Sequence, residues 1–177
     1  DEPALQDYLA RIREQLGVEE LRWPLVVAAN RAPIQAASVR EVAISINGRP
    51  ESFELDQVVD LAVVGGGPAG LAAAVYGASE GLSVVVLEAE AIGGQAGTSS
   101  MIRNYLGFPR GISGMRLAQR ARNQAIRFGT QFYTGWPALR LEIGRLGEPH
   151  LVCTEGGDVR ARAVVIATGV TYRKLGV

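Results

Sequence analysis

The sequence has very little cysteine and histidine. Cys153 is the one cysteine and His150 the one histidine among 177 residues. A single cysteine cannot form a disulfide within the chain, nor the Cys-x-x-Cys pair of a dithiol redox site. Neither residue has a neighbouring acid–base partner or metal-ligand spacing. We therefore predict packing roles for both, no metal site, and no catalytic residue in this chain.

Charge imbalance and long apolar runs are also missing. Lys and Arg together number 18, as do Asp and Glu, so no net field favours nucleic acid or an anionic membrane. No apolar run approaches the roughly 18 to 20 residues of a membrane span. The first residues, Asp1-Glu2-Pro3, do not resemble a signal peptide. We expect a cytoplasmic protein that binds neither nucleic acid nor membrane.

Residues 1–57 predict a small α/β appendage followed by a linker. Apolar residues at helical spacing between Leu5 and Leu16 predict a helix, and 24–28 predicts a short buried strand. Ser38 and Glu41 have the spacing of a capping box, in which each side chain accepts a hydrogen bond from a free backbone N–H group at a helix start. That second helix is expected to end near Ile46.

The order helix, strand, helix is weakly similar to part of a thioredoxin-like or glutaredoxin-like domain. An unrelated docking arm is the alternative. Residues 48–57 contain glycine, proline and several acids, which is typical of a linker.

A βαβ unit begins at residue 58. Residues 58–64 form a nearly continuous apolar run rich in valine, as expected of a strand buried on both faces of a parallel sheet. Residues 71–80 predict an alanine-rich helix, and 83–87 predict a second buried strand. A unit of about 30 residues in this order is the usual βαβ supersecondary structure.

A glycine turn joins the first strand to the helix. Gly65, Gly67 and Gly70 have the G-x-G-x-x-G spacing, with Pro68 and Ala69 between the last two. The first glycine permits the tight turn, the second leaves room for a pyrophosphate, and the third lets the helix pack close to the strand. The helix N-terminus offers unpaired N–H groups to the phosphates. The turn predicts a dinucleotide site.

Glu88 strengthens this interpretation. It ends the second strand, about 20 residues after the turn, where an acid accepts hydrogen bonds from ribose hydroxyls. An acid there would repel a 2′-phosphate. The role of three other segments stays open from the residues alone. Gly94 and Gln95 follow the second strand, and Thr168 and Gly169 follow a predicted buried strand. Asn104 precedes a Tyr-Leu-Gly-Phe-Pro stretch that suits either contact with a planar ring or core packing.

The remaining sequence predicts one more helix and several strands. Residues 115–128 predict the helix. Strands are expected at 131–134, 138–143, 150–154, 159–162 and 163–167, and the second to fourth of these alternate and are joined by glycine turns, as in an antiparallel meander. We predict an α/β fold with a Rossmann-like βαβ core and an antiparallel β-meander, preceded by the appendage. The domains are 1–57 and 58–177.

Together these motifs resemble thioredoxin-reductase-like flavoproteins of the pyridine nucleotide-disulfide oxidoreductase family. The resemblance covers roughly 59–174, and the stretch 93–114 is most similar to bacterial fusion proteins with an upstream sensor or thioredoxin-like domain. It implies FAD as the cofactor, with the glycine turn on the pyrophosphate, Glu88 on the ribose, Gly94 and Gln95 near the flavin, Asn104 near the isoalloxazine ring, and Thr168 and Gly169 along the FAD channel.

The resemblance also implies an activity: hydride passes from NADPH to flavin and then to a disulfide or another acceptor. NADPH would be a co-substrate that this chain does not bind, because the second glycine motif, the Cys-x-x-Cys pair and the second FAD segment of the family are missing from it. A thioredoxin-like or other redox partner and a homodimer are compatible expectations. The alternatives are a dithiol oxidase, a ferredoxin–NADP reductase-like flavoenzyme, and a non-catalytic nucleotide-binding regulatory module.

Overall fold

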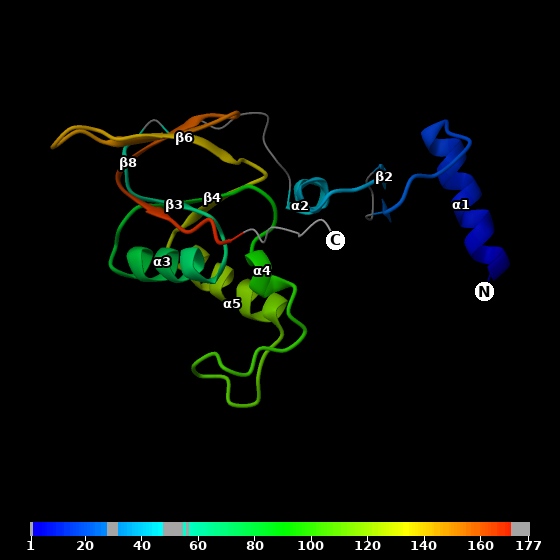
Figure 1. The fold of residues 1–177 in the computed structure, drawn as a ribbon, viewed down its shortest axis with the longest axis horizontal. Helices are drawn as coiled ribbons and strands as arrows, with labels where there is room; N and C mark the ends of the chain where they lie inside the picture. Colours follow the sequence, from blue (N-terminus) through cyan, green and yellow to red (C-terminus); the bar gives the residue numbers. More distant parts are fainter. Residues whose placement is uncertain (1, 28–31, 48–54, 56, 171–177) are drawn as a thin grey trace, which may run out of the picture. The chain divides into compact units, whose positions relative to one another are not determined.

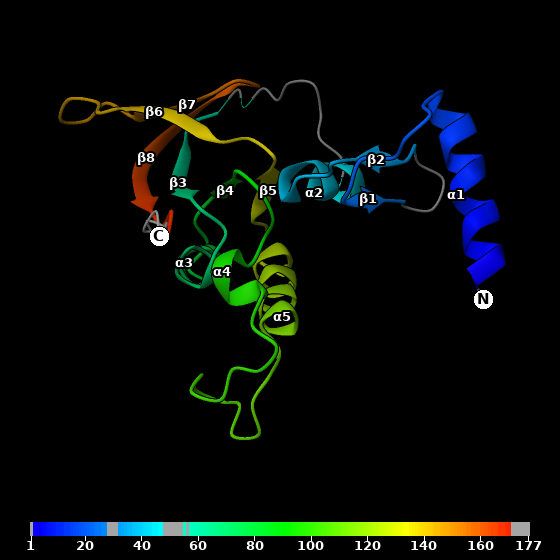
Figure 2. The ribbon, with the colours of Figure 1, turned by 45° about the vertical axis from the view of Figure 1, so that its right-hand side comes forward.

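The chain forms two compact units, Asp1–Gly48 and Arg49–Val177. The computed structural model describes residues 2–27, 32–47, 55 and 57–170. Figures 1 and 2 show the ribbon from two sides. Each unit is described by itself below, and most of the predicted linker, 48–57, lies outside the described residues.

The first unit contains two helices and a small sheet. Helix α1 (Glu2–Leu16) buries Ile12, and strand β1 (Leu25–Val26) pairs antiparallel with β2 (Ile34–Gln35). Helix α2 (Val39–Asn47) begins at the predicted capping box. The Ser38 backbone N–H donates to Glu41 Oε2 at 2.8 Å, and the Glu41 N–H donates to Ser38 Oγ at 3.2 Å. Both helices therefore form where the sequence predicts them.

The second unit is built on a six-stranded sheet with the order β5-β4-β3-β8-β7-β6. Four strands run parallel: β3 (Val59–Val64), β4 (Val84–Glu88), β5 (Gln131–Thr134) and β8 (Asp158–Ile166). Strands β6 (Ala138–Glu142) and β7 (His150–Thr154) complete an antiparallel meander with β8. The predicted α/β fold and its meander are confirmed.

The prediction of two strands at 159–162 and 163–167 is wrong. Strand β8 is continuous, and it serves two neighbours. Residues Asp158 to Ala161 pair antiparallel with β7, and Ala161 to Ile166 pair parallel with β3. The first part alternates exposed and buried residues. The second part, 163–166, is a continuous apolar run that the sequence predicts to be buried, and in the structure it is largely exposed.

The two faces of the parallel strands are covered differently. Helices α3 (Pro68–Ser79) and α5 (Gly114–Arg127) lie on one face, and the β6–β7 hairpin lies toward the other (Figures 1 and 2). Because successive side chains of a strand point to opposite faces, Val84 and Val86 pack with the helices while Val85 and Leu87 pack with the meander. These valines are almost fully buried, and each buried side chain of this size contributes roughly 1.5–3 kcal/mol.

A hydrogen-bonded carboxylate ties the starts of β3 and β4 together. Asp60 Oδ2 accepts from Ser83 Oγ at 2.7 Å and from the Ser83 N–H at 3.0 Å, and Asp60 Oδ1 lies 3.4 Å from Arg162 Nε on β8. The two bonds from Ser83, and more weakly the Arg162 charge, lower the pKa of Asp60 below its usual 3.8.

This pKa shift predicts an acid-sensitive contribution to stability. A carboxyl group with a lowered pKa in the folded state stabilises the fold above its unfolded pKa, and that stabilisation is lost as the pH falls through the folded pKa. We expect Asp60→Asn to lower the melting temperature at pH 7, and the difference from wild type to shrink as the pH falls below about 4. Melting curves of both proteins from pH 7 to 3 measure this, with Asp158→Asn on β8 as the control. A difference that is independent of pH would contradict the role of the Asp60 charge.

Candidate dinucleotide-binding site

The carboxyl ends of β3, β4 and β8 meet at one edge of the sheet, where ligands of α/β folds bind. A cavity of about 590 Å³ lies there. Four segments form its walls: the glycine turn at 65–69, residues 88–90 after β4, residues 94–96, and residues 167–170 after β8. The volume lies within the range of small-molecule and cofactor sites.

The three glycines of the G-x-G-x-x-G motif have different environments. A methyl group at Gly65 would overlap the Ala167 carbonyl oxygen, and one at Gly70 would overlap the Gly65 carbonyl oxygen. At Gly67 the same methyl group would meet no atom within 4 Å. Gly65 and Gly70 are therefore required by the packing of the turn itself, whereas Gly67 leaves a space that faces the cavity.

Two backbone N–H groups at the start of α3 have no partner within the helix. The first hydrogen bond of α3 is the one that the Leu71 N–H donates to the Gly67 carbonyl at 2.9 Å. Ala69 and Gly70, in the first turn, therefore have no intrahelical acceptor for their N–H groups. Pro68 at the first helical position has no N–H to lose. The helix N-terminus also carries the positive end of the helix dipole.

Glu88 is held in place by the main chain. Its Oε2 accepts from the Gly66 N–H at 2.6 Å, and its Oε1 accepts from the Glu90 N–H at 2.8 Å. Each oxygen keeps a lone pair for a further donor, such as a ribose hydroxyl. The carboxylate thus links the glycine turn to the end of β4 and lines the cavity.

The electrostatic character of the cavity suits a dinucleotide with an internal pyrophosphate. Among the described residues that line it, Glu88 and Glu90 are charged and no Lys or Arg occurs. Phosphate charge would therefore be met by backbone N–H groups and the dipole of α3. The two carboxylates disfavour a ligand with an additional phosphate on the ribose.

Helix α4 (Gly94–Gly97) supplies a wall that the sequence did not predict as regular structure. Gly93 and Gly94 have φ values of 116° and 52°, which only glycine adopts without strain. The Gly93 N–H donates to the Gly66 carbonyl at 2.8 Å. This bond places α4, with Gly94 and Gln95, directly beside the glycine turn.

Most of the residues predicted from the sequence come together here. Those that line the cavity are Gly65, Gly67, Pro68, Ala69, Glu88, Gly94, Gln95, Thr168 and Gly169. Gly70 lies beneath the turn. Asn104 is exposed in the 98–113 loop and is not among the lining residues, so its place near the flavin stays a prediction. Five lining residues were not predicted, and their one signal in the sequence is adjacency to predicted residues: Ala89, Glu90, Ala96, Ala167 and Val170.

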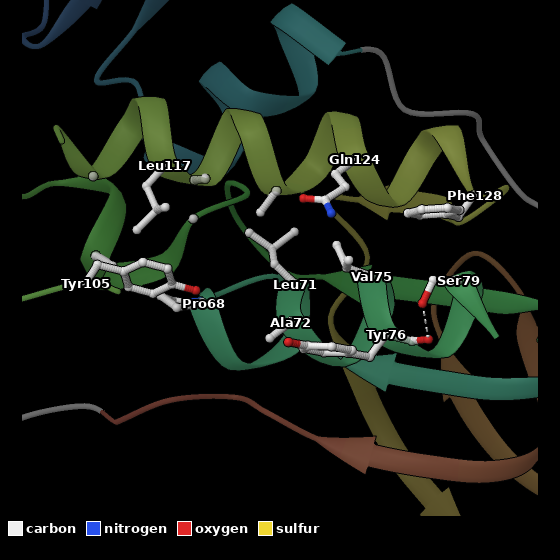
Figure 3. Close-up of a pocket in the computed structure, with 15 residues that line it drawn as sticks. Pro68, Leu71, Ala72, Val75, Tyr76, Ser79, Tyr105, Leu117, Gln124 and Phe128 are labelled. Carbon is white, nitrogen blue, oxygen red and sulfur yellow. Dashed lines mark hydrogen bonds between the residues drawn. The ribbon is translucent and has the colours of Figure 1, made fainter. Parts of the chain in front are cut away.

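A second cavity, of about 300 Å³, lies between α3 and α5. Figure 3 shows Leu71, Val75 and Leu117 pointing into it, with Phe128 and Tyr105 toward its ends. Its polar groups are few, and the Ser79 hydroxyl donates to the Tyr76 carbonyl at 2.9 Å. Among the residues that the structure describes, no charged side chain lines this cavity, and no ribose-binding acid comparable to Glu88 occurs in it.

Within the described ranges, no group of His, Cys, Asp and Glu side chains could hold a metal ion. No helix in that part of the chain is both long and apolar enough to cross a bilayer. His150 has a structural contact, because its Nδ1 accepts from the Gly144 N–H at 3.1 Å.

Comparison with known proteins identifies the family. Residues 59–177 match the family model described as pyridine nucleotide-disulphide oxidoreductase. The chain belongs to this family. FAD with NADPH is the cofactor pair of the family, which confirms the family and the cofactor class predicted from the sequence.

Similar proteins are thioredoxin reductases. The thioredoxin reductase of Borreliella burgdorferi is 35% identical over 122 residues, covering 69% of this chain and 36% of the relative. The bifunctional thioredoxin reductase/thioredoxin of Mycobacterium leprae is 36% identical over 132 residues, covering 73% and 28%. The crystal structure of thioredoxin reductase from Streptococcus pyogenes matches with a TM-score of 0.63 and 35% identity, covering 70% and 39%. The chain thus spans about a third of the length of its curated relatives.

Proposed function

We propose that this chain holds the adenosine and pyrophosphate of FAD in an NADPH-dependent flavoprotein oxidoreductase of the thioredoxin-reductase type. The observation that carries the proposal is the contrast within the glycine turn: Gly65 and Gly70 are closed by packing, and Gly67 opens on the cavity. The fit of Glu88 and of the α3 N-terminus to ribose and phosphate supports it.

The residues of this chain have binding and positioning roles. Gly67 and the first turn of α3 would bind the pyrophosphate, and Glu88 would bind the ribose hydroxyls. The part of the cofactor that leads to the flavin would lie along Gln95, Thr168 and Gly169. The flavin, when bound, supplies the hydride and electron transfer from NADPH to a disulfide or another acceptor. We further propose a thioredoxin-like redox partner, a cytoplasmic location and a homodimer for the whole protein.

Flavin content tests the proposal directly. The purified protein should carry the visible absorbance of bound flavin, and NADPH should bleach it when the whole protein is used. A whole protein that neither retains nor binds added FAD would rule the proposal out. If flavin is bound but NADPH does not bleach it, the proposed FAD site would stand and NADPH would be excluded as the electron donor.

Two neighbouring acids provide a residue-level prediction. Glu88→Ala removes an acceptor for ribose hydroxyls, and hydrogen bonds to a charged group contribute roughly 1.5–3 kcal/mol. We expect FAD affinity to fall about 10- to 100-fold. Glu90→Ala removes an acid from the same cavity whose side chain has no role in the proposed ribose contact, and FAD affinity should change little. Flavin-fluorescence titration of both apoproteins measures this, and equal losses in the two variants would contradict the assignment of Glu88.

A further inference from the structure

Helix α5 lies in a stretch of the chain that has no acidic residue. Residues 91–141 contain no Asp or Glu, although acids and bases are equal in number over the whole chain. The same stretch contains seven arginines, four of them on α5: Arg103, Arg110, Arg116, Arg120, Arg122, Arg127 and Arg140. The neighbouring helix α3 has no charged residue between Pro68 and Ser79. The positive charge of α5 is therefore not balanced by its own segment or by α3.

Three of these arginines form a row along the outer face of α5, which we call the arginine stripe. Arg116, Arg120 and Arg127 are all exposed. At about 100° per residue they lie within about 40° of one another around the helix axis. The buried residues of α5, such as Ala118 and Ala125, lie on the opposite side of the helix. Among the residues that the structure describes, no carboxylate forms an ion pair with any arginine of the stripe.

Exposed apolar side chains flank the stripe on both sides. Phe128 is 47% exposed and lies on the side toward α3, where it lines the cavity between the two helices. Met115 and Ile126 are 71% and 43% exposed and lie on the other side of the stripe. Arginine, methionine and aromatic residues are enriched in protein–protein interfaces, whereas nucleic-acid interfaces are more polar. This face of α5 therefore has the composition expected of a surface that binds a protein.

We propose that the arginine stripe binds an acidic amphipathic helix of a partner protein. Along the axis of α5, Arg120 lies about 6 Å from Arg116, and Arg127 about 16 Å from it. A second helix that lies parallel to α5, with carboxylates at positions i, i+4 and i+11, would match this spacing. Each guanidinium could then donate two hydrogen bonds to one carboxylate, and apolar residues beside the acids would pack on Met115 and Ile126.

The stripe is separate from the sites described above. None of its arginines lines the dinucleotide cavity or the cavity between α3 and α5. A second copy of this chain would not fit through a symmetric contact, because two stripes of like charge would face each other. The proposal therefore stands apart from the FAD site, and it concerns a different protein as the partner.

Fluorescence anisotropy with a labelled helical peptide tests the proposal on the full chain. The probe, about 18 residues long, has Glu at i, i+4 and i+11 with leucines beside that row, and its control has the same composition with the Glu residues spread around the helix. Because exposed ion pairs are individually weak, we expect Arg116→Gln with Arg127→Gln to lower the affinity for the probe about 3- to 30-fold. Arg116→Glu with Arg127→Glu should abolish binding. Flavin content and the melting temperature should stay near those of wild type.

Matched variants separate the stripe from a general effect of charge. Arg11→Gln with Arg145→Gln removes two exposed arginines elsewhere, on α1 and between β6 and β7, and should change the affinity less than about 2-fold. Arg120 is left in place, because its guanidinium lies 5.6 Å from the centre of the Phe108 ring in the 98–113 loop. Its loss could alter that loop as well as the stripe.

Four outcomes would overturn the proposal. Equal affinity for the patterned and the control peptide would mean unspecific attraction of anions. A DNA duplex that binds more tightly than the probe, and is lost in the same variants, would make the stripe a nucleic-acid surface. Self-association of the wild type that the Arg116→Gln, Arg127→Gln protein lacks would make it a contact between copies. Loss of flavin together with peptide binding would show that the arginines support the cofactor site.

Discussion

Gly67→Val is expected to abolish FAD binding while the protein stays folded. The branched side chain would fill the one open space of the glycine turn, where the pyrophosphate would lie. The backbone tolerates the change, because Gly67 has φ −74° and ψ −176°, an extended conformation open to any residue. Valine is a poorer N-cap than glycine and costs about 1 kcal/mol, which leaves the fold intact.

The measurement combines flavin content with folding. Visible absorbance per mole of purified Gly67→Val protein should be at background, and FAD titration should show at least a 100-fold loss of affinity, about 2.7 kcal/mol. Circular dichroism and the melting temperature should stay near those of the wild-type apoprotein. Full flavin content in this variant would refute the assignment of the site.

Two other glycines serve as matched controls. Gly97→Ala adds a methyl group in α4 whose nearest atom, the Ile92 carbonyl oxygen, is 4.0 Å away, and it should retain FAD. Gly70→Ala forces a methyl group onto the Gly65 carbonyl oxygen and should destabilise the turn itself. Substitutions at two glycines of one motif are thus expected to act differently: Gly67→Val blocks the cofactor, and Gly70→Ala destabilises the fold.

The sequence predicts the parts of this fold that have a clear hydrophobic pattern or a recognisable local motif. The valine runs of β3 and β4, the β6–β7 hairpin, and the Ser38–Glu41 capping box all appear where expected. Each of these depends on the burial or hydrogen bonding of a few neighbouring residues. That information is present in a short window of sequence.

The parts that the sequence does not predict depend on distant contacts. Two glycines among the four residues of α4 argue against a helix by propensity, and the helix forms because it is packed between the glycine turn and the start of α5. The two-residue strands β1 and β2 are too short to show a period. The sequence predicts two strands where β8 is continuous, because the first half of β8 pairs with β7 and the second half with β3.

The same reasoning explains the site. Glycine spacing and the position of Glu88 carry a mechanism that is visible in sequence. The hydrogen bond that Gln95 Nε2 donates to the Val170 carbonyl joins residues 75 positions apart, and nothing in either segment indicates the other. The sequence therefore predicts which residues line the cavity better than it predicts how the walls of the cavity are held together.

The second large effect is expected far from the cavity, at Gly156→Ala in the turn between β7 and β8. A methyl group there would overlap the six-membered ring of Trp136, which is 1% exposed. Trp136 packs against Val85, Leu87 and Val152 in the core between the sheet and the meander, so the ring has no free space to enter. Overpacking a well-packed core costs typically 1–3 kcal/mol. We expect the upper end of that range, about 3 kcal/mol, because the displaced group is large and rigid.

Urea denaturation of a double-mutant cycle separates this clash from a general effect of alanine in a turn. In a Trp136→Leu background, Gly156→Ala should cost less than about 1 kcal/mol, because the smaller side chain leaves room for the methyl group. Gly147→Ala, at a turn glycine with φ 88° and no atom within 4 Å of the added methyl, should cost about 1 kcal/mol through backbone strain alone, in either background. An equal cost of Gly156→Ala with and without Trp136 would mean that the turn backbone requires glycine. A cost that disappears with the indole means that the Trp136 ring, packed against Gly156, is what excludes a side chain from this turn.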